Sequence, residues 1–221
     1  MIADPLLWLL QSNDSAYPSG SYAHSFGLEE LVESGIVHDA LSLETFLNRQ
    51  IIPALLTFEL PFFARAHDAA VAQDHEALLA LDQELDAWRI PHEIRDASRR
   101  IGSQRLDLFA SLDASPFITR FRAACPRCHQ IVVSALEHAF LPAPQAARAI
   151  AFQTIAGLTA ASMKLIRIGP SACQKILRRS LEHIGPQIDA ALVREPCGWF
   201  NPLLEIASLR HERSHARLFI S

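Results

Sequence analysis

The amino-acid sequence predicts an all-α protein, a single-domain helical bundle of about eight to ten helices. Apolar residues recur every three or four positions along most of the 221 residues, which is the period of an amphipathic helix. No Asn-Gly or Asp-Gly hairpin signal occurs. The best strand candidate, FITRF at 117–121, is too short and too isolated to build a sheet.

Three apolar stripes at helical spacing are the strongest local signals. Each stripe covers one side of a helix and must therefore pack against a neighbouring element. The stripes consist of Leu47, Ile51, Leu55, Phe58 and Phe62, then Leu78, Leu81, Leu85 and Trp88, and finally Leu177, Leu181, Ile184, Ile188 and Leu192.

Helix boundaries follow from capping residues and prolines. Ser42 is the expected cap of a long third helix, and Pro144 fits the first turn of a helix over about 144–167. Pro53 and Pro61 fall inside a periodic stretch, so we expect that helix to be kinked or split there. Breaks between helices are expected at SLDASP, LPAPQ, IGPS and REPCGWFNP.

Composition excludes several classes of protein. The net charge of -4 gives no attraction to nucleic acid or to an acidic membrane surface. The most apolar segments are interrupted by Glu59, Gln153 and Lys164, and neither reaches the run of about 18 residues that a membrane helix needs. Four cysteines without a signal peptide favour reduced thiols and a cytoplasmic location.

Motifs of nucleotide-dependent and nucleophilic enzymes are missing from the sequence. It contains neither GxxxxGK nor GxGxxG, and no GxSxG elbow. We therefore expect no catalytic residue, no resident metal and no cofactor.

The segment CPRCH at 125–129 has the CxxC spacing of half a zinc site, with His129 as a possible third ligand. A structural zinc site usually draws on a second close pair of ligands, whereas the other cysteines stand alone at 173 and 197. The alternative is a pair of thiols at a helix start, with Pro126 in the first turn of that helix.

The last residues, LRHERSHARLFIS, contain HExxH, formed by His211, Glu212 and His215. On a helix this pattern places two imidazoles on one face for zinc, with the glutamate as general base. A catalytic zinc takes three protein ligands, and no His, Asp, Glu or Cys follows His215. A basic terminal helix that faces solvent or a partner is the competing interpretation.

The most informative stretch is YPSGSYAHSFGLEELVESGIV at 17–37. Pro18 to Ser21 predict a turn, and His24 to Glu33 predict a helix with apolar Phe26, Leu28 and Leu31. From composition alone this is a loop and a helix that cover the core.

Three ordered stretches resemble the urease accessory protein F (UreF) family. The first stretch matches a family pattern in Pro18, Gly20, Tyr22, Ser25, Gly27, Leu28 and Glu29. SMKLIRIGPSACQKIL is similar to a second family segment, with Lys164 and Gln174 aligned, although Cys173 stands where the family tends to have Gly. The terminus is similar to a third, in which Tyr is more common at the position of His215. CPRCH has no counterpart in the family pattern.

The resemblance implies one urease accessory domain over 1–221, with 205–221 as a segment that docks a partner. It implies a non-enzymatic scaffold and homodimer that bridges the UreD/UreH accessory protein and the UreG GTPase. The complex would engage apo-urease for GTP-dependent nickel insertion. Helices over 144–167 and 171–194 are apolar enough for a dimer interface, but equally for a core.

Six residues are the expected contacts with partners: Tyr22, His24, Lys164, His211, His215 and Arg217. Arg217 offers a planar fork of five donors, and we expect it to bind near Tyr22 and so to order the tail and the 17–37 stretch together. Lys164 is either a core-edge lysine with a solvated ammonium or a partner contact. Besides the scaffold, a zinc hydrolase using the HExxH tail and an unrelated helical regulatory module remain as alternatives.

Overall fold

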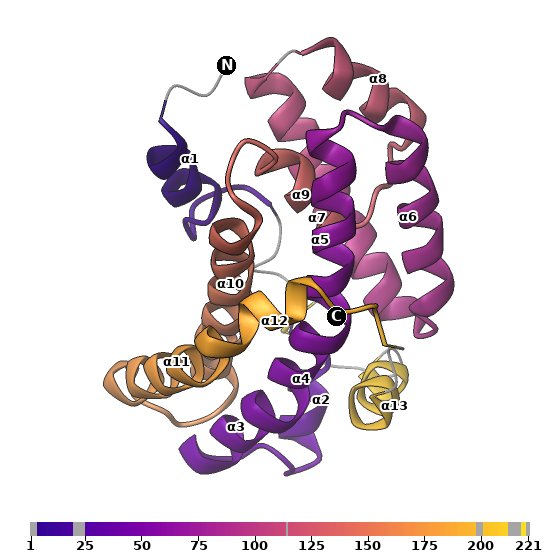
Figure 1. The fold of residues 1–221 in the computed structure, drawn as a ribbon. Coiled ribbons are helices and arrows are strands. Elements are labelled where there is room, and N and C mark those ends of the chain that lie inside the picture. The colour runs from indigo at the N-terminus through magenta and orange to yellow at the C-terminus, as the bar shows by residue number, and fades with distance from the viewer. Residues whose placement is uncertain (1–3, 20–24, 114, 198–200, 212–217, 220–221) are drawn as a thin grey trace.

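The computed structural model describes residues 4–19, 25–113, 115–197, 201–211 and 218–219, and these residues are arranged as a bundle of helices (Figure 1). They form ten continuous helical runs and no strand, which confirms the predicted all-α single domain. The runs are α1 (Pro5–Ser12), α2 (Leu28–Glu33), α3 to α5 (Ala40–Val71), α6 (His75–Trp88), α7 (His92–Leu112), α8 (Pro116–Ala124), α9 (Gln130–Glu137), α10 (Ala143–Leu165), α11 with η4 and α12 (Pro170–Leu192), and α13 (Pro202–His211).

The long run from α3 to α5 passes its two prolines without breaking. It contains α3 (Ala40–Phe46), η2 (Leu47–Ile51), α4 (Ile52–Ala54), η3 (Leu55–Glu59) and α5 (Leu60–Val71), of which η2 and η3 are π-helical turns. A proline has no N–H, so the carbonyl four residues earlier lacks its usual donor; for Pro61 this is the Thr57 carbonyl, which accepts from the Cys197 N–H at 2.9 Å. Directly before the two prolines, the N–H of Ile52 donates to the Leu47 carbonyl, five residues back, and that of Leu60 to the Leu55 carbonyl. The expected kinks therefore take the form of two π turns.

Two expected helix starts were wrong by a few residues. Asp39, and not Ser42, caps α3: the Asp39 carboxylate accepts from the Ser42 N–H, and the Ser42 side chain reaches back to the Asp39 backbone. α2 begins at Leu28 and not at His24, because Phe26 and Gly27 adopt positive φ angles of 51° and 84°, which a right-handed helix does not allow.

The weak strand candidate at 117–121 belongs to a helix. It lies within α8, where the Ser115 side chain accepts from the Ile118 N–H and caps the helix, with Pro116 in the first turn.

α9 is the centre of the core. Every residue from Ile131 to Glu137 is buried, and the helix packs against α5 and α7. Burying Glu137 requires a partner, and Arg105 of α7 supplies it, with Nε donating to Glu137 Oε2 at 2.7 Å. The Tyr17 hydroxyl donates to the same carboxylate at 3.1 Å, and the Trp8 indole donates to the Glu137 carbonyl. These bonds attach α1 and the residues after it to the core.

α2 and the C-terminal region, which are far apart in sequence, pack together at another part of the same core. α10 packs against α11 and also contacts α2, while α13 lies against α2 and α7 (Figure 1). None of the described helices combines the length and apolar character needed to cross a membrane.

Candidate functional site

The contact between α2 and α13 depends on a glycine. Gly27 precedes α2 with φ of 84°, a conformation that side chains rarely adopt. A Cβ placed on Gly27 would lie 3.3 Å from Cβ of Ala207 in α13. Glycine at this position therefore permits both the turn into α2 and the close approach of α13.

Three charged side chains meet where these helices join α7. His211, the last residue of α13, is fully buried, and its Nε2 lies 2.9 Å from Glu29 Oε2 of α2. Its Nδ1 lies 2.7 Å from Glu93 Oε1 of α7. The Ser208 hydroxyl, one turn earlier in α13, donates to the other Glu93 oxygen at 3.2 Å. We call Glu29, Glu93 and His211 the junction.

The charges of the junction suit the helix ends that carry them. Glu29 and Glu93 lie in the first turns of α2 and α7, and His211 lies in the last turn of α13. Helix N-termini favour negative charge and C-termini favour positive charge. Burial lowers the pKa of His211, but the hydrogen bonds and charges of Glu93 and Glu29 outweigh burial, so the pKa lies above its usual value. The ring is thus held as an imidazolium that donates from both nitrogens.

The end of the chain is also bound to Glu29. The backbone N–H of Leu218 donates to Glu29 Oε1 at 2.7 Å, and that of Phe219 donates to Oε2 at 3.1 Å. The buried Phe219 ring lies 5.2 Å from the ammonium of Lys164, in the last turn of α10. Glu29 therefore accepts from both parts of the C-terminal region.

The residues before α2, helix α11 and helix α13 also line one cavity of about 560 Å³. Phe26 lines it from the residues before α2, Gln174 from α11 and Leu204 from α13. The three stretches that carry the family resemblance thus lie next to one another, although they are separated in sequence.

The six expected contact residues divide into two groups. Lys164 and His211 are described: the Lys164 ammonium lies over Phe219, and His211 shares Glu29 with the Leu218 and Phe219 N–H groups. His211 is completely buried, whereas Lys164 is exposed and has its ammonium over Phe219. Tyr22, His24, His215 and Arg217 lie outside the described residues. The predicted pairing of Arg217 with the Tyr22 loop stays a prediction, but Leu218, the next residue, is bound to α2.

In the junction, His211 is not available as the first zinc ligand of the HExxH pattern. Zinc needs a neutral imidazole with a free lone pair on one nitrogen, and both nitrogens of His211 face carboxylates at hydrogen-bond distance. Glu212 and His215 lie outside the described residues. His211 therefore serves as the cation of a buried ion cluster.

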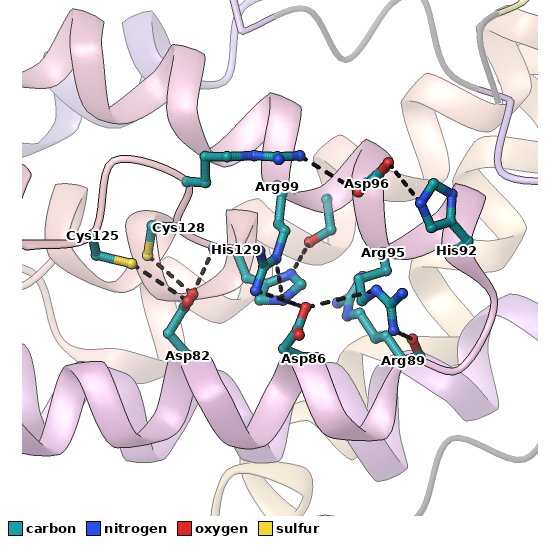
Figure 2. A network of polar contacts seen from close by, with 12 residues as sticks. Asp82, Asp86, Arg89, His92, Arg95, Asp96, Arg99, Cys125, Cys128 and His129 are labelled. Carbon is teal, nitrogen blue, oxygen red and sulfur yellow. Dashed lines mark hydrogen bonds and ion pairs between the residues drawn. The ribbon is translucent and has the colours of Figure 1, made fainter.

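The CPRCH segment lies directly before α9, as expected, but two details of the sequence interpretation were wrong. Pro126 lies in a turn between α8 and α9, because α9 begins only at Gln130, so it is not in the first turn of a helix. The His129 ring points away from the thiols: its Nδ1 lies 3.1 Å from Ser98 Oγ and its Nε2 lies 3.3 Å from Asp86 Oδ1 (Figure 2). The two thiols instead face Asp82 of α6.

Arginines surround His129 as carboxylates surround His211. Asp86 is paired with Arg99 at 2.8 Å and lies 3.8 Å from Arg95 (Figure 2). Burial, followed by the charges of Arg89, Arg99 and Arg95, lowers the pKa of His129 to about 2. The ring is neutral at physiological pH.

Sequence reasoning missed the acidic partners in both places. Glu29 was part of the matched pattern but was not expected to hold the terminus, and Glu93 and Asp82 carried no local signal at all. Each of them meets its partner across at least 40 residues of sequence, so only the packing of the helices brings the groups together.

The fold and the site define an all-helical protein in which three signature segments meet at a buried charged junction. The family model for UreF matches residues 37–181. The chain belongs to the UreF family of urease accessory proteins.

Similar proteins cover nearly the whole chain. The urease accessory protein UreF of Bacillus sp. (strain TB-90) is 31% identical over 98% of this chain and 99% of its own length. That of Klebsiella pneumoniae (strain 342) is 30% identical over 99% of both chains. That of Arthrobacter sp. (strain FB24) is 29% identical over 97% of this chain and 96% of its own. The similarity therefore includes both the 17–37 stretch and the C-terminal region.

Proposed function

We propose that this protein is a urease maturation factor that acts as a non-enzymatic scaffold in the cytoplasm. It bridges the UreD/UreH accessory protein and the UreG GTPase, and the complex presents nickel to apo-urease in a GTP-dependent step. Membership of the UreF family supports the urease pathway. The observation that carries a binding role is the convergence of the three signature segments at the junction.

The proposed docking surface is the C-terminal segment 205–221 together with the 17–37 stretch. Because His211 is buried, its proposed role is to hold this segment in place, whereas the exposed Lys164 can contact a partner directly. Tyr22, His24, His215 and Arg217 complete the proposed surface. The bonds from Leu218 and Phe219 to Glu29 support a docking segment that is held against α2 at these two residues before a partner binds.

Co-purification with the partner proteins tests this proposal. Tagged wild-type protein is expected to capture the UreD/UreH protein, and the resulting pair to capture the UreG GTPase. Arg217→Ala and Tyr22→Phe should each weaken capture about tenfold or more, as interface residues do when they contribute over about 1.4 kcal/mol. Arg178→Ala is the matched control, because Arg178 is an exposed arginine paired with Glu182 within α11.

Capture of both partners by both variants at the wild-type level would show that the C-terminal segment and the 17–37 stretch do not form the docking surface. Failure of the wild-type chain to capture either partner would contradict the scaffold itself.

The proposed homodimer is a separate step. Phe152 and Met163 are exposed apolar side chains on α10 and support an interface there. Light scattering of the purified chain should give twice the monomer mass, and Phe152→Glu should reduce it to the monomer value. A monomeric wild-type protein at micromolar concentration would exclude a dimer formed without partners.

A further inference from the structure

The proposed scaffold function assigns no role to the two thiols in the turn between α8 and α9. Cys125 Sγ lies 3.4 Å from Asp82 Oδ2, and Cys128 Sγ lies 3.2 Å from Asp82 Oδ1. One ligand atom from each residue lies within 4.8 Å of the other two. Figure 2 shows both sulfur atoms directed at the carboxylate, which projects from α6. Among the described residues, these form the one such group of three potential metal ligands.

We propose that Cys125, Cys128 and Asp82 bind a thiophilic divalent cation, for which zinc is the appropriate probe. Two thiolates and one carboxylate suit a borderline-soft cation and do not suit magnesium or calcium. Zinc–sulfur bonds of about 2.3 Å and zinc–oxygen bonds of about 2.1 Å at tetrahedral angles require sulfur–oxygen separations of about 3.6 Å. The two thiols approach different oxygens of Asp82, at 3.2 and 3.4 Å, and one ligand atom from each residue lies within 4.8 Å of the other two, so the group has to rearrange by only a small amount to surround an ion.

The donors are held in position by groups behind them. Asp82 Oδ1 accepts from the backbone N–H of His129 at 2.7 Å, which fixes the carboxylate relative to the turn. α7 presses on the same turn at Gly102, where a Cβ would lie only 2.0 Å from the Cys128 carbonyl oxygen. A side chain at Gly102 is therefore incompatible with this turn, and the approach of α7 restricts its movement.

The surrounding charges permit a cation. The arginines close to His129 are occupied by carboxylates, Arg89 by Glu59 at 2.7 Å and Arg99 by Asp86. On binding, each thiol releases its proton to solvent as its metal–sulfur bond forms, so the two thiolates and the carboxylate carry three negative charges against the two positive charges of the ion. Cys128 is completely buried and Cys125 is half-buried, so the ion enters beside Cys125, where water can supply a fourth ligand.

Metal titration of the full-length protein tests this site independently of its function in urease maturation. The chain is purified with a non-thiol reductant, stripped with a chelator and titrated with zinc against a colorimetric competitor. Wild-type protein should bind one equivalent, and Cys128→Ser and Asp82→Asn should each weaken binding at least about 100-fold. Cys197→Ser is the matched control, because Cys197 is exposed and lies far from the cluster in sequence.

Cobalt provides a direct readout of the sulfur ligands. The cobalt-loaded wild type and the Cys197→Ser variant should show thiolate-to-metal charge-transfer absorption, and the Cys125→Ser/Cys128→Ser double variant should lack it while circular dichroism remains helical. Absence of this absorption in the wild type overturns the proposal, whatever the variants do. Binding that survives the double variant, or that disappears in Cys197→Ser, also overturns it, because the metal would then be bound elsewhere.

Discussion

His211 and His129 are equally buried, with no exposed surface, yet their neighbours shift the two pKa values in opposite directions. His211 has a carboxylate at each ring nitrogen, and its pKa lies above the usual value. His129 has a single carboxylate, Asp86, which is already paired with Arg99, and burial together with nearby arginines lowers its pKa to about 2. Burial opposes the imidazolium in both places, so the balance of neighbouring charges decides the outcome.

The comparison also explains why the histidines of two metal-like patterns are not free to bind a metal. HExxH and CPRCH each contain a histidine that the sequence alone offers as a ligand. In the structure one ring is the cation of an ion cluster, and the other is a neutral group bonded to Ser98 and Asp86. Residue spacing indicates which side chains share a helix face, but the charges across the interface determine what the ring can bind.

The largest effect is expected from breaking the junction. Glu29→Ala leaves the buried His211 with one carboxylate fewer and removes the acceptor of the Leu218 and Phe219 N–H groups. Removing one partner of a buried ion pair costs about 3–5 kcal/mol, so the free energy of unfolding should fall by about that amount. Urea denaturation measures it. Glu33→Ala, an exposed glutamate of the same helix, should change it by less than about 0.5 kcal/mol.

The two histidines should make the free energy of unfolding depend on pH in different pH ranges, His129 below about pH 6.5 and His211 above it. Between about pH 6.5 and pH 2, His129 is protonated in the unfolded chain but not in the folded protein. The free energy of unfolding therefore falls as the pH decreases, by up to about 1.4 kcal/mol per pH unit. Above about pH 6.5 the folded His211 keeps a proton that the unfolded chain releases, so its contribution is lost as the pH rises through the folded pKa.

Denaturation curves at a series of pH values separate these two effects. His129→Gln should flatten the acidic limb and leave the alkaline limb unchanged, and His211→Gln should do the reverse. If both variants lose the same limb, the pKa values of the two rings are not shifted in opposite directions.

Comparing two glycines separates the effect of the contact between α2 and α13 from that of backbone strain. Gly27 and Gly35 both have positive φ, 84° and 73°, but only at Gly27 does an added Cβ meet neighbours, whereas at Gly35 none lies within 4 Å. Gly35→Ala should cost about 1 kcal/mol of stability from backbone strain alone, and Gly27→Ala about 1–2 kcal/mol more. Thermal unfolding measures the difference. Equal costs at the two sites would mean that α13 does not press on Gly27.

The smallest effect is expected at Lys164. Its ammonium lies over Phe219 at an exposed site, where a cation–π contact contributes about 0.5–1 kcal/mol. Lys164→Gln should lower stability by that amount, and Lys175→Gln, an exposed lysine of α11, serves as the control. A partner contact made by Lys164 would appear instead as weaker capture of the UreD/UreH protein with stability unchanged.

The helices could be predicted from the sequence, because their information is local. The stripe from Leu47 to Phe62 and the proline at position 144 identify elements that the structure contains. The start of α2 could not be placed, since the positive φ of Phe26 is imposed by packing and is not a preference of phenylalanine.

The site depended on information that is not local. The bonds from Leu218 and Phe219 to Glu29 place part of the tail against the 17–37 stretch, while the expected pairing of Arg217 with Tyr22 stays a prediction. Nothing near His211 pointed to Glu93, which lies 118 residues away. In the same way, Asp82 is 46 residues from Cys128 and carries no spacing that marks it as a ligand.

The protonation of the two rings tests the account most directly. Nuclear magnetic resonance of the protein with ¹⁵N-labelled histidine side chains follows each ring through a pH titration, with His211→Gln and His129→Gln providing the assignments. We expect His211 to titrate above pH 6.5 and His129 to remain neutral at about pH 4, some two units above its pKa. Titration of His211 below pH 6.5 would contradict the account, because the carboxylates of Glu29 and Glu93 could not then hold the terminus through a charged imidazole.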